Sequence, residues 1–287
     1  GVCILFSCTP MVIGQTNTDS LNLALKSQKA DTNKVRSYEQ AYILLRYENH
    51  RLAFEYIQKS LELAKKLNYT LGELSGYLAL GEYYENRGKR DSAHITYSNA
   101  YKVATKMNHR IGITESMVGL SSTLASMQNL KEADSIANLG ITIAKKEPLD
   151  SLRLTYFYMF LSNTSYFRDD FEQSIVYTQK ALEFNGNNFY NKARNELGIG
   201  GLFRVLGNYE KTEEYYRKAL ETAKSANKNQ RLTALVQSEM ASLKSDLKDY
   251  KAAKYYYDSA LAYFEKVDDL LMMAELNNSL GKTNHER

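Results

Sequence analysis

The sequence contains few of the residues that interrupt helices or cross-link chains. Its 287 residues include 2 prolines, 15 glycines, 2 cysteines and no tryptophan. Proline and glycine both destabilise helix interiors, so their scarcity favours a mostly helical chain. Both cysteines, Cys3 and Cys8, lie at the start of the chain, which leaves no disulfide framework and no paired-cysteine metal site for the remainder.

Clusters of one charge and recognisable catalytic motifs are also missing. The formal net charge is only +4, and basic and acidic residues alternate, as in residues 210–214. The sequence has no basic block of the kind that binds phosphates, which argues against direct nucleic-acid binding. The four histidines show no zinc-motif spacing, and the glycines of residues 198–201 fall inside an expected helix, where close helix packing explains them. We therefore expect no enzyme activity, no cofactor and no metal.

Residues 1–14 are uncharged and largely apolar, unlike the rest of the chain. They are too short to span a bilayer as a helix and look like the remnant of a secretory signal peptide, cleaved after Gly14. The basic start of such a signal is missing, which indicates that the true start lies upstream. A lipid anchor at Cys8 and a buried N-terminal element are alternatives. We expect a periplasmic or other extracytoplasmic location, with lipid anchoring as an alternative and a cytoplasmic location less favoured.

Small residues recur at regular intervals along the chain. One series is spaced by 38 to 41 residues and consists of Ala53, Ala93, Ala133, Ser174, Thr212 and Ala253. A second series repeats the same spacings and consists of Ser60, Ala100, Gly140, Ala181, Ala219 and Ala260. Small side chains let two helix backbones approach closely, so this pattern indicates a repeated pair of packed helices.

Residues 74–107 contain the clearest example of this pattern. Two helical segments flank Gly88, whose freedom to adopt positive φ suits a helix end. Small residues at Gly81 and Ala93 and large ones at Tyr84 and Tyr97 complete a pattern that resembles the tetratricopeptide repeat (TPR). The resemblance implies an all-α, right-handed α-solenoid of about seven helix pairs. Its period of roughly 40 residues exceeds the family's period of about 34.

The resemblance also predicts the organisation of the chain. We expect a lead-in segment at residues 15–33 with a short capping helix, followed by an array at residues 34–287. The array would contain six complete repeats and the first helix of a seventh, over residues 273–285. Its last apolar face would be covered either by a continuation of the chain or by a partner. Thr212 and Lys244 depart from the repeat pattern and weaken individual repeats without changing the fold class.

In the family, one side of each first helix lines a concave groove where peptides or partner segments bind. When the family's repeat register is applied to this sequence, that side of the helix carries tyrosine rings, an asparagine amide and arginine cations in the fourth and fifth repeats. In the second repeat it carries carboxylates. The candidate ligand-binding residues are Tyr156, Asn163, Tyr166, Arg194, Arg204 and Glu82. Arginine and tyrosine suit carboxylates and peptide carbonyls, whereas asparagine can both donate to and accept from an extended backbone. The alternative is that these side chains bridge neighbouring helices and stay solvated.

These observations predict a non-catalytic module that binds a protein or peptide. A secretory leader followed by repeats of this length resembles the extracytoplasmic TPR sensor region of bacterial membrane histidine kinases and LuxR-type regulators. That resemblance implies contact with a membrane only through a missing C-terminal segment or a lipid at Cys8. A secreted or lipid-anchored scaffold is the first alternative, and an enzyme accessory or cytoplasmic adaptor is the second.

Overall fold

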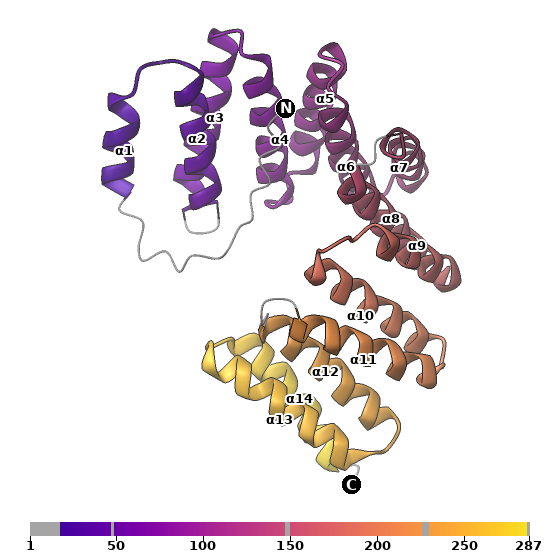
Figure 1. Ribbon diagram of the computed structural model, residues 1–287. Helices are drawn as coiled ribbons and strands as arrows, with labels where there is room; N and C mark the ends of the chain where they lie inside the picture. Colours follow the sequence, from indigo (N-terminus) through magenta and orange to yellow (C-terminus); the bar gives the residue numbers. More distant parts are fainter. Residues whose placement is uncertain (1–17, 47–48, 147–149, 226–229, 286–287) are drawn as a thin grey trace. The chain divides into compact units, whose positions relative to one another are not determined.

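The computed structural model describes residues 18–46, 49–146, 150–225 and 230–285, and the predictions for residues 1–14 lie outside this part. Every regular element in the described ranges is helical. The helices (Figure 1) are α1 (Thr18–Ser27), α2 (Thr32–Leu45), α3 (His50–Lys66), α4 (Thr70–Glu85), α5 (Arg90–Lys106), α6 (Arg110–Ser126), α7 (Leu130–Ala144), α8 (Ser151–Tyr166), α9 (Phe171–Glu183), α10 (Phe189–Val205), α11 (Tyr209–Ser225), α12 (Gln230–Asp246), α13 (Tyr250–Lys266) and α14 (Leu270–His285).

The chain forms two compact units, residues 1–112 and residues 113–287, which are described separately. In unit 1, α2 packs on α3 and α4 packs on α5. In unit 2, the pairs are α8 with α9, α10 with α11 and α12 with α13, and α14 packs on α13 (Figure 1). Helix α6 crosses from one unit into the other. The predicted all-α solenoid of repeated helix pairs is confirmed.

The small residues of the two series pack at the centre of the helix pairs. All twelve are buried, and eleven of them are at most 1% exposed. Aromatic rings fill the space beside two glycines of the first helices. A Cβ atom at Gly81 would lie 2.6 Å from the Tyr97 ring, and one at Gly200 would lie 2.4 Å from the Tyr216 ring. Glycine at these two sites therefore admits a tyrosine that any larger residue would displace.

The residues that depart from the repeat pattern find polar partners. The Thr212 hydroxyl, although fully buried, donates to the Asn208 carbonyl oxygen at 2.9 Å. Lys244 extends from α12 and donates to Glu213 of α11 at 2.8 Å. The hydrogen bond from Lys244 lowers the pKa of the Glu213 carboxyl below its ordinary value. Each departure is thus accommodated by one local polar contact.

Most helices end with one residue in the left-handed region. Gly88 has φ 65°, as its place in the sequence predicts, and the following Lys89 N–H donates to the Tyr84 carbonyl oxygen at 2.9 Å. This is the closing hydrogen bond of a Schellman motif. Residues other than glycine take the same conformation at further turns, namely Asn68, Asn108, Gln128, Asp169, Lys248 and Asp268.

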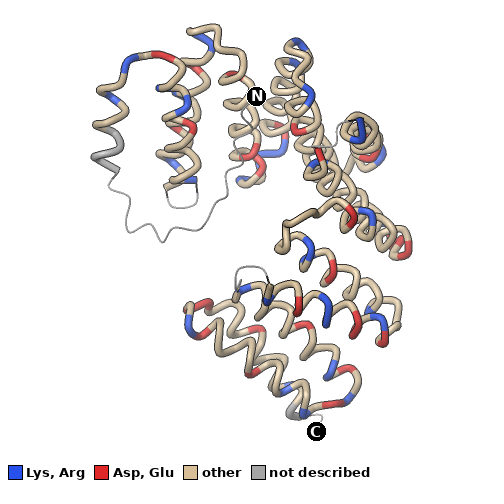
Figure 2. The backbone as a smooth tube through the Cα atoms, viewed as in Figure 1, with Lys and Arg blue, Asp and Glu red and all other residues tan. Residues whose placement is uncertain are grey.

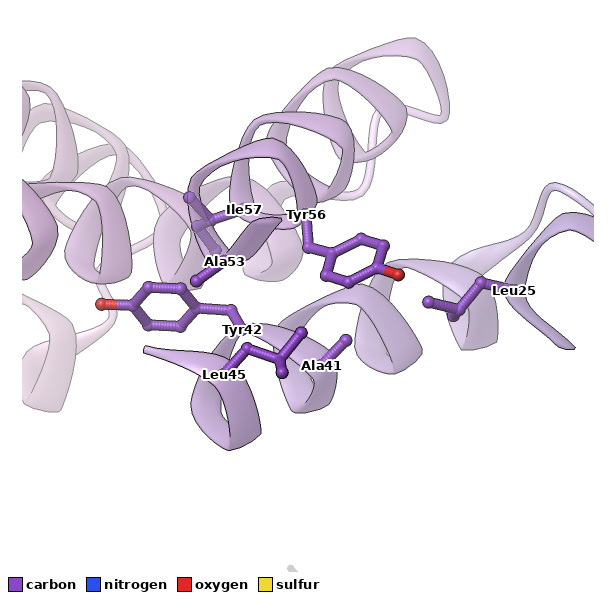
Figure 3. Packing of buried hydrophobic residues seen from close by; sticks show 7 residues of the cluster. All are labelled: Leu25, Ala41, Tyr42, Leu45, Ala53, Tyr56 and Ile57. Carbon is purple, nitrogen blue, oxygen red and sulfur yellow. The ribbon is translucent and has the colours of Figure 1, made fainter. Parts of the chain in front are cut away.

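The core of unit 1 continues from the first helix pair to the lead-in helix. Figure 3 shows Ala41, Tyr42 and Leu45 of α2 facing residues of α3. The Tyr56 ring of α3 points toward Leu25 of α1, which is only 3% exposed. Helix α1 therefore packs against the first helix pair. Over the described residues, acidic and basic side chains alternate along the helices without forming a block of one sign (Figure 2).

Candidate functional site

A groove of about 720 Å³ opens in unit 2 between α8 and α10, with contributions from α9, α11 and α12. Four of the predicted ligand-binding residues line it: Asn163, Tyr166, Arg194 and Arg204. They come from successive first helices, as the repeat register requires. The structure thus brings together side chains that lie more than forty residues apart in the sequence.

Two predicted residues are not among those lining the groove. Tyr156 lies on the same helix as Asn163 and is 42% exposed. Glu82 belongs to α4 of unit 1, where it accepts from Arg46 at 2.8 Å and from the Tyr42 hydroxyl at 3.4 Å. Its carboxylate therefore bridges the first helices of neighbouring repeats, the alternative that the sequence analysis left open.

Arg204 is occupied by carboxylates of the chain itself. Its Nε lies 2.7 Å from Asp246 Oδ2, and its Nη1 lies 3.4 Å from Glu239 Oε2, both on α12. Burial opposes the charge on Arg204, yet the hydrogen bond and attraction from Asp246 outweigh it and raise the guanidinium pKa. Burial also raises the pKa of Glu239, which the Tyr216 hydroxyl contacts at 3.5 Å. Arg204 thus joins α10 to α12 and is already paired.

Arg194 and Asn163, in contrast, have no polar partner in the described part of the chain. The Arg194 guanidinium is exposed and contacts only the Tyr190 ring, whose centroid lies 5.7 Å away. The Asn163 side chain is also exposed and lines the groove. Both groups can therefore bind a ligand without first breaking a hydrogen bond or an ion pair within the protein.

Between the two arginines, two glycines leave the backbone of α10 without covering side chains. A Cβ atom at Gly198 would meet nothing within 4 Å, and one at Gly201 would meet only the Tyr216 hydroxyl, at 3.8 Å. Both glycines line the groove. The packing explanation predicted for residues 198–201 holds for Gly200 and is wrong for Gly198 and Gly201, since Gly198 faces open space and Gly201 has room for a Cβ atom.

The buried wall of the groove carries a polar residue that the sequence analysis missed. Asn195 is 3% exposed, and its Nδ2 has no hydrogen-bond partner in the described chain. Nearby hydroxyls satisfy one another instead, since Ser162 Oγ lies 2.9 Å from Ser174 Oγ and 2.6 Å from Thr178 Oγ1. The repeat register gave no signal for Asn195, because it places this residue neither on the side of the first helix that packs against the second helix nor on the side that lines the groove.

One end of the groove is apolar. Tyr166, Val205 and Tyr209 line it there and are 46%, 55% and 40% exposed. The Phe171 ring packs edge-on against Tyr166, with centroids 5.5 Å apart. Aromatic and aliphatic surface exposed inside a groove is typical of a site that receives an apolar side chain.

The described residues show no sign of a metal centre or a membrane span. No cluster of three or more histidine, cysteine, aspartate or glutamate residues among them could hold a metal ion. None of their helices combines the length and apolar character needed to cross a bilayer.

Comparisons with known proteins agree with this architecture. The sequence profile of the tetratricopeptide repeat family matches residues 191–266, which span α10 to α13. No curated protein matches the chain in sequence.

Several solved structures share the fold. A signal transduction ATPase with a tetratricopeptide repeat sensor from Pyrococcus horikoshii superposes with a TM-score of 0.67 at 20% identity, over 89% of this chain and 41% of that protein. This chain therefore spans less than half of that protein. The apo quorum sensor NprR from B. thuringiensis gives 0.63 at 12% identity, over 92% of this chain and 80% of its own. A Rap protein in complex with Competence and Sporulation Factor superposes with a TM-score of 0.65 at 12% identity, over 94% of this chain and 80% of that protein.

At these identities the likeness establishes the fold, and the profile match identifies the repeat. The predicted tetratricopeptide repeat is confirmed: the family's profile matches residues 191–266, and solved structures that contain this repeat share the fold over most of the chain.

Proposed function

We propose that this chain is a non-catalytic binding module that holds an extended protein segment in the groove between α8 and α10. One observation carries the proposal: the backbone of α10 is bare at Gly198 and Gly201, beside the unpartnered side chains of Asn163 and Arg194. A segment can approach this backbone closely, and the amide and guanidinium can bind its carbonyl oxygens and side chains. Among proteins of the same fold, the Rap complex with its factor supports a role in recognition.

The experiment that tests this function is a selection from a displayed library of random twelve-residue peptides on the 287-residue chain. An enriched peptide is then synthesised with a fluorophore, and its dissociation constant is measured by anisotropy. We expect Gly201→Leu to weaken binding at least tenfold, because the new side chain enters the groove while its Cβ is accommodated. Asn163→Ala should weaken it by a smaller factor, through the loss of one or two hydrogen bonds.

The matched control is Gly281→Leu on α14. A Cβ atom there also meets nothing within 4 Å, and Gly281 does not line the groove. This variant should bind the peptide like the wild type. Equal affinity of the wild type and Gly201→Leu would place binding elsewhere and contradict the proposal.

A sensory role in a larger extracytoplasmic signalling protein is the finer form of the proposal. The repeat sensor of the Pyrococcus horikoshii ATPase supports it as an example of this fold within a signalling protein. A scaffold or adaptor that only assembles other proteins is the competing form. The gene sequence beyond Arg287 discriminates between them: a span of about twenty apolar residues followed by an output domain favours the sensor, and a stop codon favours the scaffold.

A further inference from the structure

We propose that the groove selects an acidic–apolar peptide segment, with its carboxylate at the Arg194–Asn195 end and its apolar side chain at the Tyr166–Val205–Tyr209 end. This inference rests on the proposed function, and it names the chemistry and the orientation of the ligand.

The charges that line the groove favour a carboxylate at only one of its two arginines. Arg204 is already paired with two carboxylates, Asp246 and Glu239. A ligand carboxylate placed there would have to compete with them. Arg194 has no acidic partner in the described chain and is exposed to solvent. It is therefore the cation that remains available to an acidic ligand.

A second donor at the same end supports this assignment. The Asn195 Nδ2 group lies inside the groove wall, at a residue that is 97% buried, and it lacks an acceptor in the described chain. A buried amide donor without a partner is costly, and a bound oxygen atom would satisfy it. Carboxylate oxygens accept several hydrogen bonds at once, so a carboxylate bound by Arg194 can also accept from the Asn195 amide once that buried side chain turns toward the groove.

The opposite end has the properties of an apolar pocket. Tyr166 comes from α8, Val205 from α10 and Tyr209 from α11. Arg204 precedes Val205 and also lines the groove, but its charge is paired with Asp246. Phe171 packs against the Tyr166 ring and holds it in place. Covering these half-exposed side chains with an aliphatic or aromatic group of the ligand would remove apolar surface from water.

The length of α10 sets the spacing between the two features. Arg194 and Val205 are eleven residues apart on this helix, which corresponds to a rise of about 16 Å. An extended chain advances roughly 3.3 Å per residue, so about five residues separate the acidic and the apolar side chains of the ligand. Gly198 and Gly201 lie along this path and leave room for the peptide backbone.

The test is a charge swap between the protein and the peptide. The probe is the labelled peptide from the selection described above, together with variants in which its glutamate or aspartate is replaced by the matching amide or by lysine. We expect the amide to bind about tenfold to a hundredfold more weakly than the acid, as for a lost charge-assisted hydrogen bond. Arg194→Glu should reverse the order, so that the lysine peptide binds more tightly than the acidic one.

Two further variants keep the test specific. Arg217→Gln removes a cation of α11 that does not line the groove, and it should leave the preference for the acidic peptide intact. Asn195→Leu removes the unpartnered amide and should weaken acidic-peptide binding severalfold, and its unfolding temperature shows whether the fold is kept. Replacing the apolar residue of the peptide by serine should weaken binding to every one of these proteins.

The outcomes separate this inference from the proposed function. One outcome would overturn the acidic assignment alone. If Gly201→Leu blocks binding of the selected peptides, but their acid and amide forms bind the wild type equally well, the groove remains the binding site. An unchanged preference in Arg194→Glu would overturn the acidic assignment as well. If Gly201→Leu blocks no selected peptide, the proposed function itself fails, and this inference fails with it.

Discussion

At the scale of single residues, glycine has two opposite roles in α10. Gly200 faces the Tyr216 ring, where an added Cβ would lie 2.4 Å from a ring carbon. Gly198, two residues earlier, faces open space, where an added Cβ has no neighbour within 4 Å. Packing therefore requires glycine at position 200, whereas at position 198 it would also admit a larger residue.

Alanine substitutions distinguish the two roles. Gly200→Ala should lower the free energy of unfolding by about 1–3 kcal/mol through overpacking. Gly198→Ala should raise it by about 0.5–1 kcal/mol, because alanine favours a helix interior. Urea unfolding followed by circular dichroism measures both. A loss of stability in both variants would mean that Gly198 also faces a packed surface.

A buried carboxyl group gives a pH-dependent prediction. Glu196 is 6% exposed, and its Oε2 has no partner in the described chain. Burial raises its pKa above the ordinary 4.5, against the opposing effects of Thr222, Lys192 and Lys218. The folded state then holds the proton more tightly than the unfolded state, so this group costs stability as the pH rises above that value.

Glu196→Gln should therefore raise the unfolding temperature at pH 7. The gain should shrink at pH 4, where the glutamate is mostly protonated in both states. Thermal unfolding at the two pH values is the measurement. Glu62→Gln, at an exposed position of α3, is the matched control and should change little at either pH. A gain for Glu196→Gln that is equal at both pH values would rule out charge burial as its cause.

At the scale of the elements, the helix ends are closed by residues whose conformation strains the backbone. Gln128, after α6, has φ 66°, and the next residue, Asn129, closes the turn by donating to the Leu124 carbonyl oxygen at 2.9 Å. An L-residue with a side chain pays about 1 kcal/mol or more in this region, whereas glycine does not. The turn geometry is thus kept even where the sequence lacks the residue best suited to it.

Gln128→Gly should stabilise the chain by about 0.5–1 kcal/mol, since it relieves this strain. The midpoint of urea unfolding is the measurement. Gln128→Ala is the control, because alanine has the same backbone restriction and should give no such gain. Equal stabilisation by both variants would point to the glutamine side chain instead of the backbone.

The helix pairs and their turns were predictable from the sequence, whereas much of the site chemistry was not. The small residues at Ala93 and Ala100 and the turn at Gly88 each follow from a local rule about helix packing or helix ends. The pairing of Arg204 with Asp246 does not, because it joins side chains 42 residues apart on neighbouring first helices. Only the packing of α10 against α12 shows that this arginine is already occupied.

At the scale of the whole molecule, each helix pair depends on its neighbours for a covered apolar face. Helix α14 packs on α13 through Leu276, which is 2% exposed, but Leu270 and Leu271 at its start are 67% and 84% exposed. Repeat arrays of this kind gain stability mainly from contacts between neighbours. The protection of backbone amides against hydrogen exchange should therefore fall toward a helix that has a described neighbour on one side only.

Native-state hydrogen exchange measures this difference directly. In the 287-residue chain, amides of α14 should exchange at least tenfold faster than those of α10 and α12, each of which packs between other helices. Peptide-resolved mass spectrometry gives the rates. Equal protection of α10, α12 and α14 would show that unit 2 unfolds as one cooperative block.

The matched pairs at the centre of the hairpins bear on how such a chain can evolve. Gly81 faces Tyr97 and Gly200 faces Tyr216, whereas Ser162 shares hydrogen bonds with Thr178 in place of a ring. A recombination event that joined α8 to α11 would bring Ser162 against a tyrosine, and one that joined α10 to α9 would leave a glycine beside a threonine. Crossovers between hairpins keep these three pairs together, but they separate Gly140 of α7 from the Phe157 ring of α8, from which a Cβ atom at Gly140 would lie only 2.2 Å away. A recombined array therefore needs matched residues at the junctions between hairpins as well as within each hairpin.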